Sequence, residues 1–428
     1  MTTLILALAS LFCVLVIPVI PLRPLIIGLV VLRSLADYGI ATGTRPTLLS
    51  AVSLAVAFIA IYTLVVHVSN RQGSPLWMRF GFPTVIVVLL WTAVGFGRYG
   101  IDGDLILESL RIVSAMAIFV LAYAYVQSSP KSPESAILWM IAPAAIISLA
   151  SGIATAEGAV TRAGRLTATF SHPNAAGAFF GVAVVVLLAI WLRNRDRITF
   201  IVGLAAGICL LLTGSLGGIV GCVVGVLVVV WTKSTDSPGR RIMQSLAIAA
   251  VLIAGYVFSG LSSRVAEFNW GAQSASKADA DSFQWRFENW RRLIDEWQEN
   301  PVVGYGWGAS SHNVLPMGGP PHSLYFQVLV DMGAIGILLL LIGVVALWKR
   351  ARKVAKLPGW EGAALLGILS FALVNGLVSN LVGYTATVYL IAAATGLTLA
   401  HVRQRNESIS QDSEWAPDGM ALAPVRKS

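Results

Sequence analysis

The chain has 428 residues, of which 56% are apolar and only 12% are charged. A soluble domain has about 25% charged residues, so the composition argues against a soluble enzyme, a disordered chain or a fibrous protein and indicates a polytopic membrane protein. The net charge of +9 is then explained by Lys- and Arg-rich cytoplasmic loops and not by nucleic-acid binding.

Apolar runs of about 20 residues are long enough to cross a bilayer as helices. They lie at 4–22, 25–40, 47–67, 82–97, 105–126, 135–154, 175–192, 198–213, 216–232, 243–260, 327–348, 361–380 and 385–402. Arg33 and Asp37 interrupt the second run. We therefore predict an all-α polytopic membrane protein with about 12 transmembrane helices.

The distribution of Lys and Arg among the short loops predicts the orientation. Loops rich in these residues, at 71–79, 193–197, 233–241 and 349–356, are expected in the cytoplasm. The predicted domains are N-terminal transmembrane helices at 1–260, a large extracytoplasmic loop at 261–326, C-terminal transmembrane helices at 327–402 and a disordered cytoplasmic tail at 403–428. The shorter loops 98–104, 155–174, 214–216 and 381–384 share the outward side.

The large outward loop contains an amphipathic helical pattern. Its apolar residues, at helical spacing, are Phe283, Phe287, Trp290, Ile294 and Trp297. They cover an arc of about 80°, and Arg286 falls about 20° beyond one edge. Such a helix either carries Arg286 as a functional cation or lies in the membrane interface with Arg286 as an anchor.

A second cluster precedes the span at 175–192. Arg162 and Arg165 are three residues apart at the predicted outer face, which suits an anion at headgroup depth, although interfacial anchoring explains each Arg singly. His172, Pro173 and Asn174 read first as a turn and a helix start.

A third cluster, Pro320 to Tyr325, precedes the span at 327–348. His322 would lie at the outer mouth of that helix, where an imidazole can accept a hydroxyl proton or simply occupy the interface. The glycine-rich segment Gly304 to Gly308 is more typical of a tight turn than of a phosphate loop. The two Asp-x-Asp pairs, at 102–104 and 279–281, are weak signals, so we expect no metal and no cofactor.

In this order the clusters resemble the O-antigen ligase and polymerase superfamily of bacterial envelope proteins. The resemblance covers roughly residues 160–345 and is carried by Gly164-Arg165-Leu166 to Phe170 with Pro173-Asn174, Arg286 to Trp290, Asn300 to Gly306, and His322-Ser323-Leu324-Tyr325 leading into Gly333 to Gly336.

The resemblance implies a GT-C-like glycosyltransferase with an outward active site in the cytoplasmic (inner) membrane and a cytoplasmic C-terminus. The donor would be a glycan on a polyprenyl diphosphate such as undecaprenyl diphosphate, and the acceptor a lipid or another glycan. Arg165 and Arg286 match the diphosphate-binding arginines and His322 matches the essential histidine, which implies inverting, metal-independent transfer. Ligase and polymerase are not separated.

Four further residues are predicted to contact the substrates: Arg162, Arg291, Asn174 and Tyr325. The sequence departs from its relatives at Thr213 to Gly218, where many carry a Ser-Arg-Gly step. Arg162, Arg98 and Arg264 are candidates to replace the absent arginine.

Two other classes of function stay open. A transporter or flippase for an anion or lipid-linked glycan would use the intramembrane charges Arg33, Asp37, Glu108 and Arg111, although pairing within each helix is the simpler interpretation. A non-catalytic scaffold of an envelope-synthesis complex is the third possibility.

Overall fold

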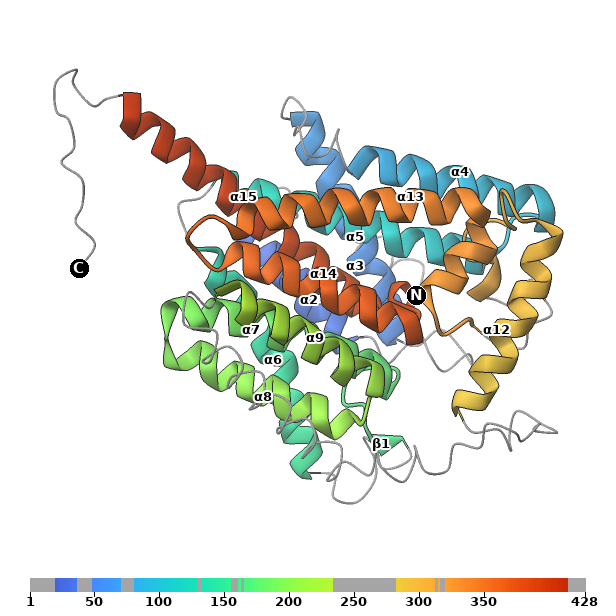
Figure 1. The fold of residues 1–428 in the computed structure, drawn as a ribbon, viewed down its shortest axis with the longest axis horizontal. Coiled ribbons are helices and arrows are strands. Elements are labelled where there is room, and N and C mark those ends of the chain that lie inside the picture. The colour runs from blue at the N-terminus through green and yellow to red at the C-terminus, as the bar shows by residue number, and fades with distance from the viewer. Residues whose placement is uncertain are drawn as a thin grey trace, which may run out of the picture.

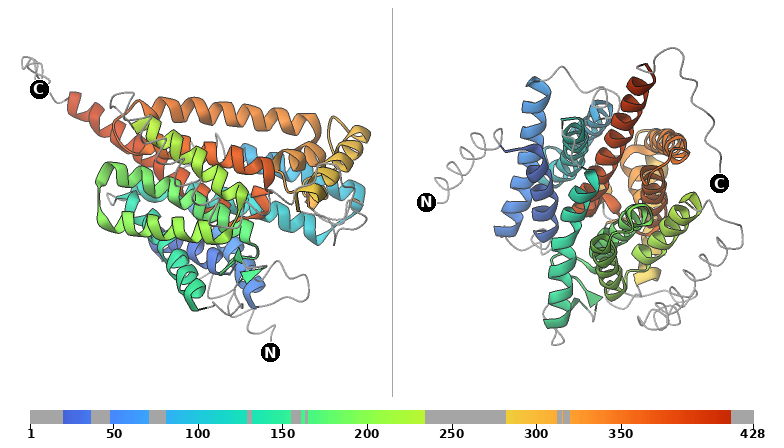
Figure 2. Two further views of the ribbon diagram at one scale, coloured as in Figure 1. Left: turned by 60° about the horizontal axis from the view of Figure 1, so that its bottom comes forward. Right: turned by 90° about the vertical axis from the view of Figure 1, so that its left-hand side faces the viewer.

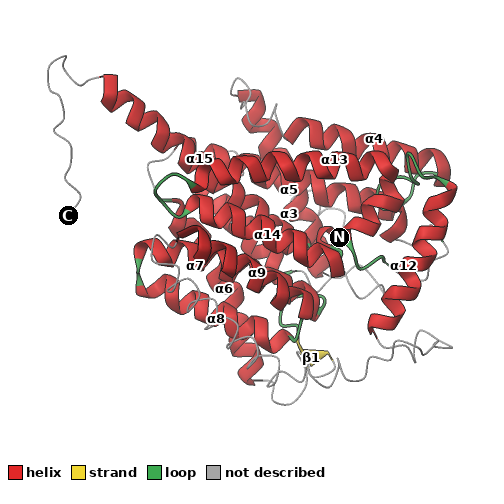
Figure 3. Ribbon diagram, viewed as in Figure 1, coloured by secondary structure: helices red, strands yellow, loops and turns green. Residues whose placement is uncertain are grey.

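The computed structural model describes residues 20–36, 48–70, 81–128, 132–154, 161–162, 165–233, 282–311, 315 and 320–414. This part of the chain is almost entirely helical, with a single two-residue β-ribbon (Figure 3). The helices are α2 Leu22–Leu35, α3 Leu48–Asn70, α4 Phe82–Tyr99, α5 Gly103–Ser128, α6 Pro133–Ala154, α7 Pro173–Asn194, α8 Arg197–Thr213, α9 Leu216–Lys233, α12 Ser282–Glu299, α13 Leu324–Ala355, α14 Glu361–Val378 and α15 Thr385–Glu414. The short elements are β1 Thr161–Arg162, β2 Arg165–Leu166, η4 Ala309–Ser311 and η5 Leu381–Gly383.

Seven of these helices, α4, α5, α6, α7, α13, α14 and α15, are long and apolar enough to cross a membrane. The prediction of an all-α polytopic membrane protein is therefore confirmed. The predicted run at 4–22, except for its last three residues, and the run at 243–260 lie outside the described residues, so the number of about 12 spans stays a prediction.

The helices pack around α15, which contacts α5, α2 and α7. Figure 2 shows α2 and α3 on one side of α15 and α7, α9, α13 and α14 on the other. The centre is filled by fully buried aromatic side chains, including Phe179, Phe180, Phe371 and Tyr389. Glycines let α7 and α9 approach closely, since a Cβ on Gly218 would lie 2.7 Å from the carbonyl oxygen of Gly177.

Two turns predicted to be cytoplasmic share one end of the bundle. The α7–α8 turn around Arg195 and the α13–α14 turn after Lys356 lie at the left in Figure 1. The helix α12 and the first turn of α13, both close to the predicted outward loop, lie at the right. The two groups of loops are thus separated by the length of the helices.

The last helix extends past its predicted end at residue 402 to Glu414. Polar residues continue it because Arg403 pairs with Glu407 one turn ahead (2.6 Å) and also reaches the Tyr123 hydroxyl (3.3 Å). The first twelve residues of the predicted disordered tail are accordingly helical, which corrects that boundary.

The ionisable residues of α5 also match expectation. Arg111 is ion-paired with Glu108, whose side chain is buried. The intrahelical pairing predicted for these two residues is confirmed, and it removes their support for a transport pathway. Arg33 is buried in α2, whereas Asp37 lies outside the described residues.

The helix α13 is interrupted at Gly333, whose φ is 64° and ψ is −160°. The loop before it fills the interruption: the amides of Tyr305 and Gly306 donate to the carbonyls of Val330 and Asp331 at 3.0 and 2.8 Å. The helix amide of Ala334 donates in turn to Pro301 (2.8 Å). The glycine-rich segment is therefore a turn locked into a broken helix, as its sequence predicts, and not a phosphate loop.

The buried carboxylate of Asp331 completes this lock. Its two oxygens accept the backbone amides of Gly308 and Ser310, each at 2.8 Å. Such a carboxylate is bound by fixed donors and holds the loop to α13.

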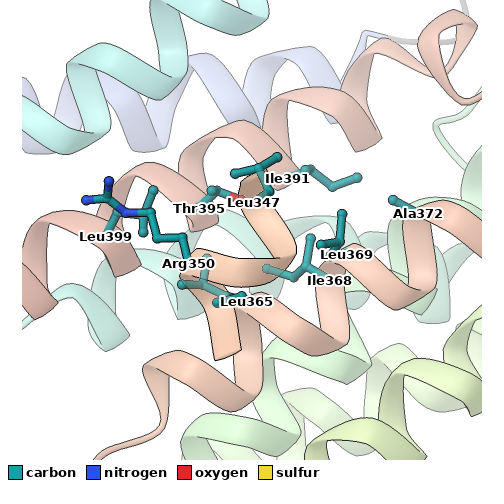
Figure 4. A pocket seen from close by; sticks show the side chains of 10 residues that line it. Leu347, Arg350, Leu365, Ile368, Leu369, Ala372, Ile391, Thr395 and Leu399 are labelled. Carbon is teal, nitrogen blue, oxygen red and sulfur yellow. The ribbon is translucent and has the colours of Figure 1, made fainter. Parts of the chain in front are cut away.

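Among the described residues, apolar clefts lie between helices, two of them along α13 to α15 and along α7 to α9. A cleft of about 90 Å³ between α13, α14 and α15 is lined by aliphatic side chains with Arg350 at one end (Figure 4). A second, of about 580 Å³, follows α7, α8 and α9 and has no charged residue in its lining. Neither contains Arg165, Arg286 or His322, so neither cleft is a candidate site for a phosphate.

Candidate functional site

The turn that carries His322 is held by α12. The indole of Trp290 donates to the carbonyl oxygen of Pro321 at 2.7 Å, and Asn289 donates to that of Pro320 at 3.3 Å. One residue before Arg286, Trp285 meets the His322 ring edge-on at a centroid distance of 5.3 Å. His322 has a φ of 50°, a left-handed conformation that these contacts maintain.

The face of α12 that contacts the protein differs from the predicted aromatic stripe. Asn289 and Leu293 are buried, whereas Phe287 and Ile294 in the predicted stripe are 48% and 38% exposed. The buried face, centred between Asn289 and Leu293, is thus rotated by about 100° from the stripe, and Arg286 lies about 40° from its centre. The guanidinium of Arg286 is turned toward α14, where it donates to the carbonyl oxygen of Val378 at 3.1 Å.

The second arginine comes from the β-ribbon, where Arg162 pairs with Arg165 in antiparallel register. The Arg165 guanidinium donates to the carbonyl oxygen of Thr213 and to Oδ1 of Asn174, both at 2.8 Å. His172 caps α7, its Nδ1 accepting the Asn174 amide at 3.1 Å. The predicted helix start thus also positions Asn174, whose side-chain oxygen orients Arg165.

The two arginines meet around Tyr384, which follows η5. Positive charges on Arg286 and Arg165 both act on its hydroxyl, and the side chains of Ser379 and Asn174 are its hydrogen-bonding neighbours. Burial raises the pKa of Tyr384 and outweighs the opposing effect of Arg286, so the phenol stays a neutral donor at physiological pH.

The His322 turn joins the same cluster. The amide of Leu324 donates to the carbonyl oxygen of Ser379 at 3.1 Å, and Ser379 directly follows the residue that binds Arg286. Segments separated by more than 200 residues in the chain, β2 and the start of α15, are therefore brought to one end of the bundle with His322 beside them.

The structure does not place the other predicted substrate contacts, Arg291, Tyr325 and Arg162, beside Tyr384. Arg291 is exposed on the opposite side of α12. The Tyr325 hydroxyl donates to the carbonyl oxygen of Leu373 at 2.8 Å and so joins α13 to α14. The side chain of Arg162 lies outside the described residues.

The other sequence signals have local explanations. Among the suggested substitutes for the absent arginine, Arg98 donates to Asn300 at 2.9 Å and lies over the ring of Tyr305, while Arg264 is outside the described residues. Asp102 accepts the amides of Asp104 and Leu105 and therefore caps α5. Asp279 lies outside the described residues.

Tyr384 and Ser379 were missed by sequence reasoning. The only signal was their position: both lie at or next to the short loop 381–384, which the charge pattern placed on the outward side. A single Tyr at the start of an apolar span is ordinary, so nothing in the sequence distinguished it.

Replacing Tyr384 with Phe removes one hydroxyl that lies between the two arginines. We expect about a tenfold loss of transfer activity with little change in stability, because one hydrogen bond to charged groups is lost while the ring remains packed. Transfer rates of the purified protein, with unfolding temperature measured in parallel, test this. Equal loss of stability would show that the hydroxyl acts only in folding.

The family model described as O-antigen ligase matches residues 200–341. Over this segment the chain is similar to the O-antigen ligase and polymerase superfamily. The matched segment, about a third of the chain, includes Arg286 and His322 but not Arg165. This similarity supports an enzyme with O-antigen ligase- or polymerase-like function in a membrane. No curated protein matches the chain.

Proposed function

We propose that this protein transfers a glycan from a polyprenyl diphosphate to a lipid or glycan acceptor at the outer face of the cytoplasmic membrane. The observation that carries the proposal is the convergence of Arg165 and Arg286 around Tyr384 at one end of an apolar helical bundle. Two guanidinium groups beside a neutral phenol form an environment for a diphosphate, whose oxygens suit the forked geometry of arginine.

The arginines supply the electrostatic part of the reaction. When the bond between the sugar and the carrier breaks, negative charge grows on the departing diphosphate. Arg165 and Arg286 are pre-oriented by backbone carbonyls and Asn174, so they stabilise that charge without rearranging. This stabilisation does not need a metal ion.

His322 is the proposed general base. It accepts the proton of the acceptor hydroxyl as the oxygen attacks the anomeric carbon, and the carrier diphosphate leaves from the opposite side. The sugar centre is thereby inverted. The ring contact with Trp285, which precedes Arg286 in α12, holds the imidazole against the same helix that carries Arg286.

The orientation follows from the same arrangement. The candidate site lies at the end of the bundle away from the α7–α8 and α13–α14 turns (Figure 1), and positive turns are favoured in the cytoplasm. We therefore infer an outward site, a cytoplasmic C-terminus, and an extracytoplasmic loop with the boundaries 261–326.

Replacing His322 with Ala tests the proposal. We expect transfer to fall by about 10²–10⁴-fold while the polyprenyl diphosphate still binds, since the base is needed for chemistry and not for carrier recognition. Purified protein in lipid nanodiscs with a polyprenyl-diphosphate-linked glycan and an acceptor gives both quantities. Full activity of this variant, or carrier flux across proteoliposomes without transfer, would contradict the proposal.

A further inference from the structure

The N-terminus of α9 lies at the centre of the arginine cluster. Ser215 begins the helix: its carbonyl oxygen accepts the amide of Ile219 at 2.8 Å and its hydroxyl accepts that of Gly218 at 3.3 Å. The amides of the first helical residues, Leu216 and Gly217, point out of the helix end, and both residues are partly exposed. A helix end of this kind favours a negative charge.

Both arginines are held by residues that touch this helix end. Arg165 binds the carbonyl oxygen of Thr213, two residues before Ser215. On the other side, a Cβ built on Gly217 would lie 2.7 Å from Val378 and 3.3 Å from the hydroxyl of Ser379. Val378 is the residue whose carbonyl oxygen holds Arg286. The helix end is therefore next to the residues whose carbonyl oxygens bind the two guanidinium groups.

An unsatisfied amide provides an independent indication of a ligand. Asn375, on α14, is fully buried, and within the described residues neither of its amide atoms has a hydrogen-bond partner. Its Nδ2 lies 3.4 Å from the Cβ position of Gly217 and so is directed at the end of α9. Buried amides are nearly always paired, and leaving one unpaired costs free energy that a bound acceptor would recover.

We propose that the N-terminus of α9 and the Asn375 amide form an anion-binding site made of uncharged donors. It binds a phosphate group of the carrier between Arg165 and Arg286. The inference rests on the proposed function and specifies how the diphosphate is held. The donors here are uncharged, so this site adds direction and hydrogen bonds but no further positive charge. It lies at the start of α9, where this chain lacks the arginine of the Ser-Arg-Gly step that many relatives carry.

The test is binding of a sugar-free polyprenyl diphosphate to the full-length protein in nanodiscs of zwitterionic lipid. Replacing Asn375 with Leu keeps the branched shape and the number of heavy atoms and removes the donor, and we expect Kd to rise about tenfold. The matched control is Ser370→Ala on the same helix, where a buried hydroxyl also lacks a partner within the described residues; its Kd should be unchanged. Adding Leu216→Arg to Asn375→Leu should restore binding by supplying new donors at the helix end.

The outcomes separate this site from the proposed function. If the native protein does not bind polyprenyl diphosphate, the proposed function itself fails. If the native protein binds it and Arg286→Ala weakens binding, but Asn375→Leu binds as tightly as the native protein, only the site at α9 is overturned. An equal tenfold loss in Ser370→Ala would show a packing effect and would overturn it as well. If the Asn375 effect appears only in nanodiscs of anionic lipid, the ligand is a lipid headgroup and the inference is also wrong.

Discussion

Arg286→Ala is expected to lower transfer by at least about 10²-fold, the loss typical when a preorganised group that stabilises developing charge is removed. The guanidinium is directed inward by α12 and fixed by the carbonyl oxygen of Val378, next to Tyr384. Arg286→Lys should recover only part of the activity, since an ammonium keeps the charge but cannot form a forked contact.

The matched control is Arg291→Ala. Arg291 lies on the same helix but is exposed on the side away from Tyr384. Although the sequence indicated it as a substrate contact, its position predicts transfer within about twofold of native. Initial rates with purified protein and a polyprenyl-diphosphate-linked glycan measure both variants. Similar losses in the two would mean that α12 as a whole, and not the inward cation, supports the reaction.

Gly333→Ala is expected to cause the largest loss of stability. The φ of 64° with ψ of −160° is a conformation open essentially to glycine, and a Cβ would lie 2.3 Å from the carbonyl oxygen of Val302. Both effects together should cost roughly 3 kcal/mol or more. They would release the loop 300–311 from α13 and with it the support of the His322 turn.

Gly343→Ala is the control for this prediction. Gly343 lies in the same helix, and nothing lies within 4 Å of the position that an added methyl group would take, so alanine should be neutral or slightly stabilising by helix propensity. Thermal unfolding followed by size-exclusion chromatography in detergent measures both proteins. An unfolding temperature of Gly333→Ala equal to native would mean that the interruption in α13 is not required for the fold.

The transmembrane helices were predictable because a run of about 20 apolar residues is by itself long enough to cross a bilayer. All the predicted runs that fall within the described residues are helices, with ends within a few residues except in α13 and α15. Both extend through polar residues, and in α15 the pair Arg403–Glu407 explains why. The length of an apolar run does not predict an extension of the helix through polar residues.

The orientation of α12 was not predictable from hydrophobicity. The apolar stripe favoured Phe287 and Ile294, yet the protein buries Asn289 and directs Arg286 inward. In a functional helix the face toward the protein is chosen by its polar partners, here the carbonyls of Pro320 and Val378. Phe287 and Ile294, on the most apolar face, then stay partly exposed.

The candidate site was only partly predictable for a related reason. Arg165, Asn174, Arg286 and His322 were identified from their motifs, and they lie at one end of the bundle. Tyr384 and Asn375 carry no local motif, since one is a single phenol at a span start and the other a single amide within an apolar helix. Their roles arise from helix packing, which brings α14 and α15 to the end of α9.

The measurement that tests the central claim most directly is the level of polyprenyl-diphosphate-linked glycan in cells lacking this protein, with glycan chain length resolved by mass. Complementation uses the native form, Arg286→Ala or Arg291→Ala. The account predicts accumulation that the native form and Arg291→Ala relieve and Arg286→Ala does not; single repeats would indicate a polymerase and long chains a ligase. If no lipid-linked glycan accumulates, or if Arg286→Ala relieves it as fully as the native form, the account is contradicted.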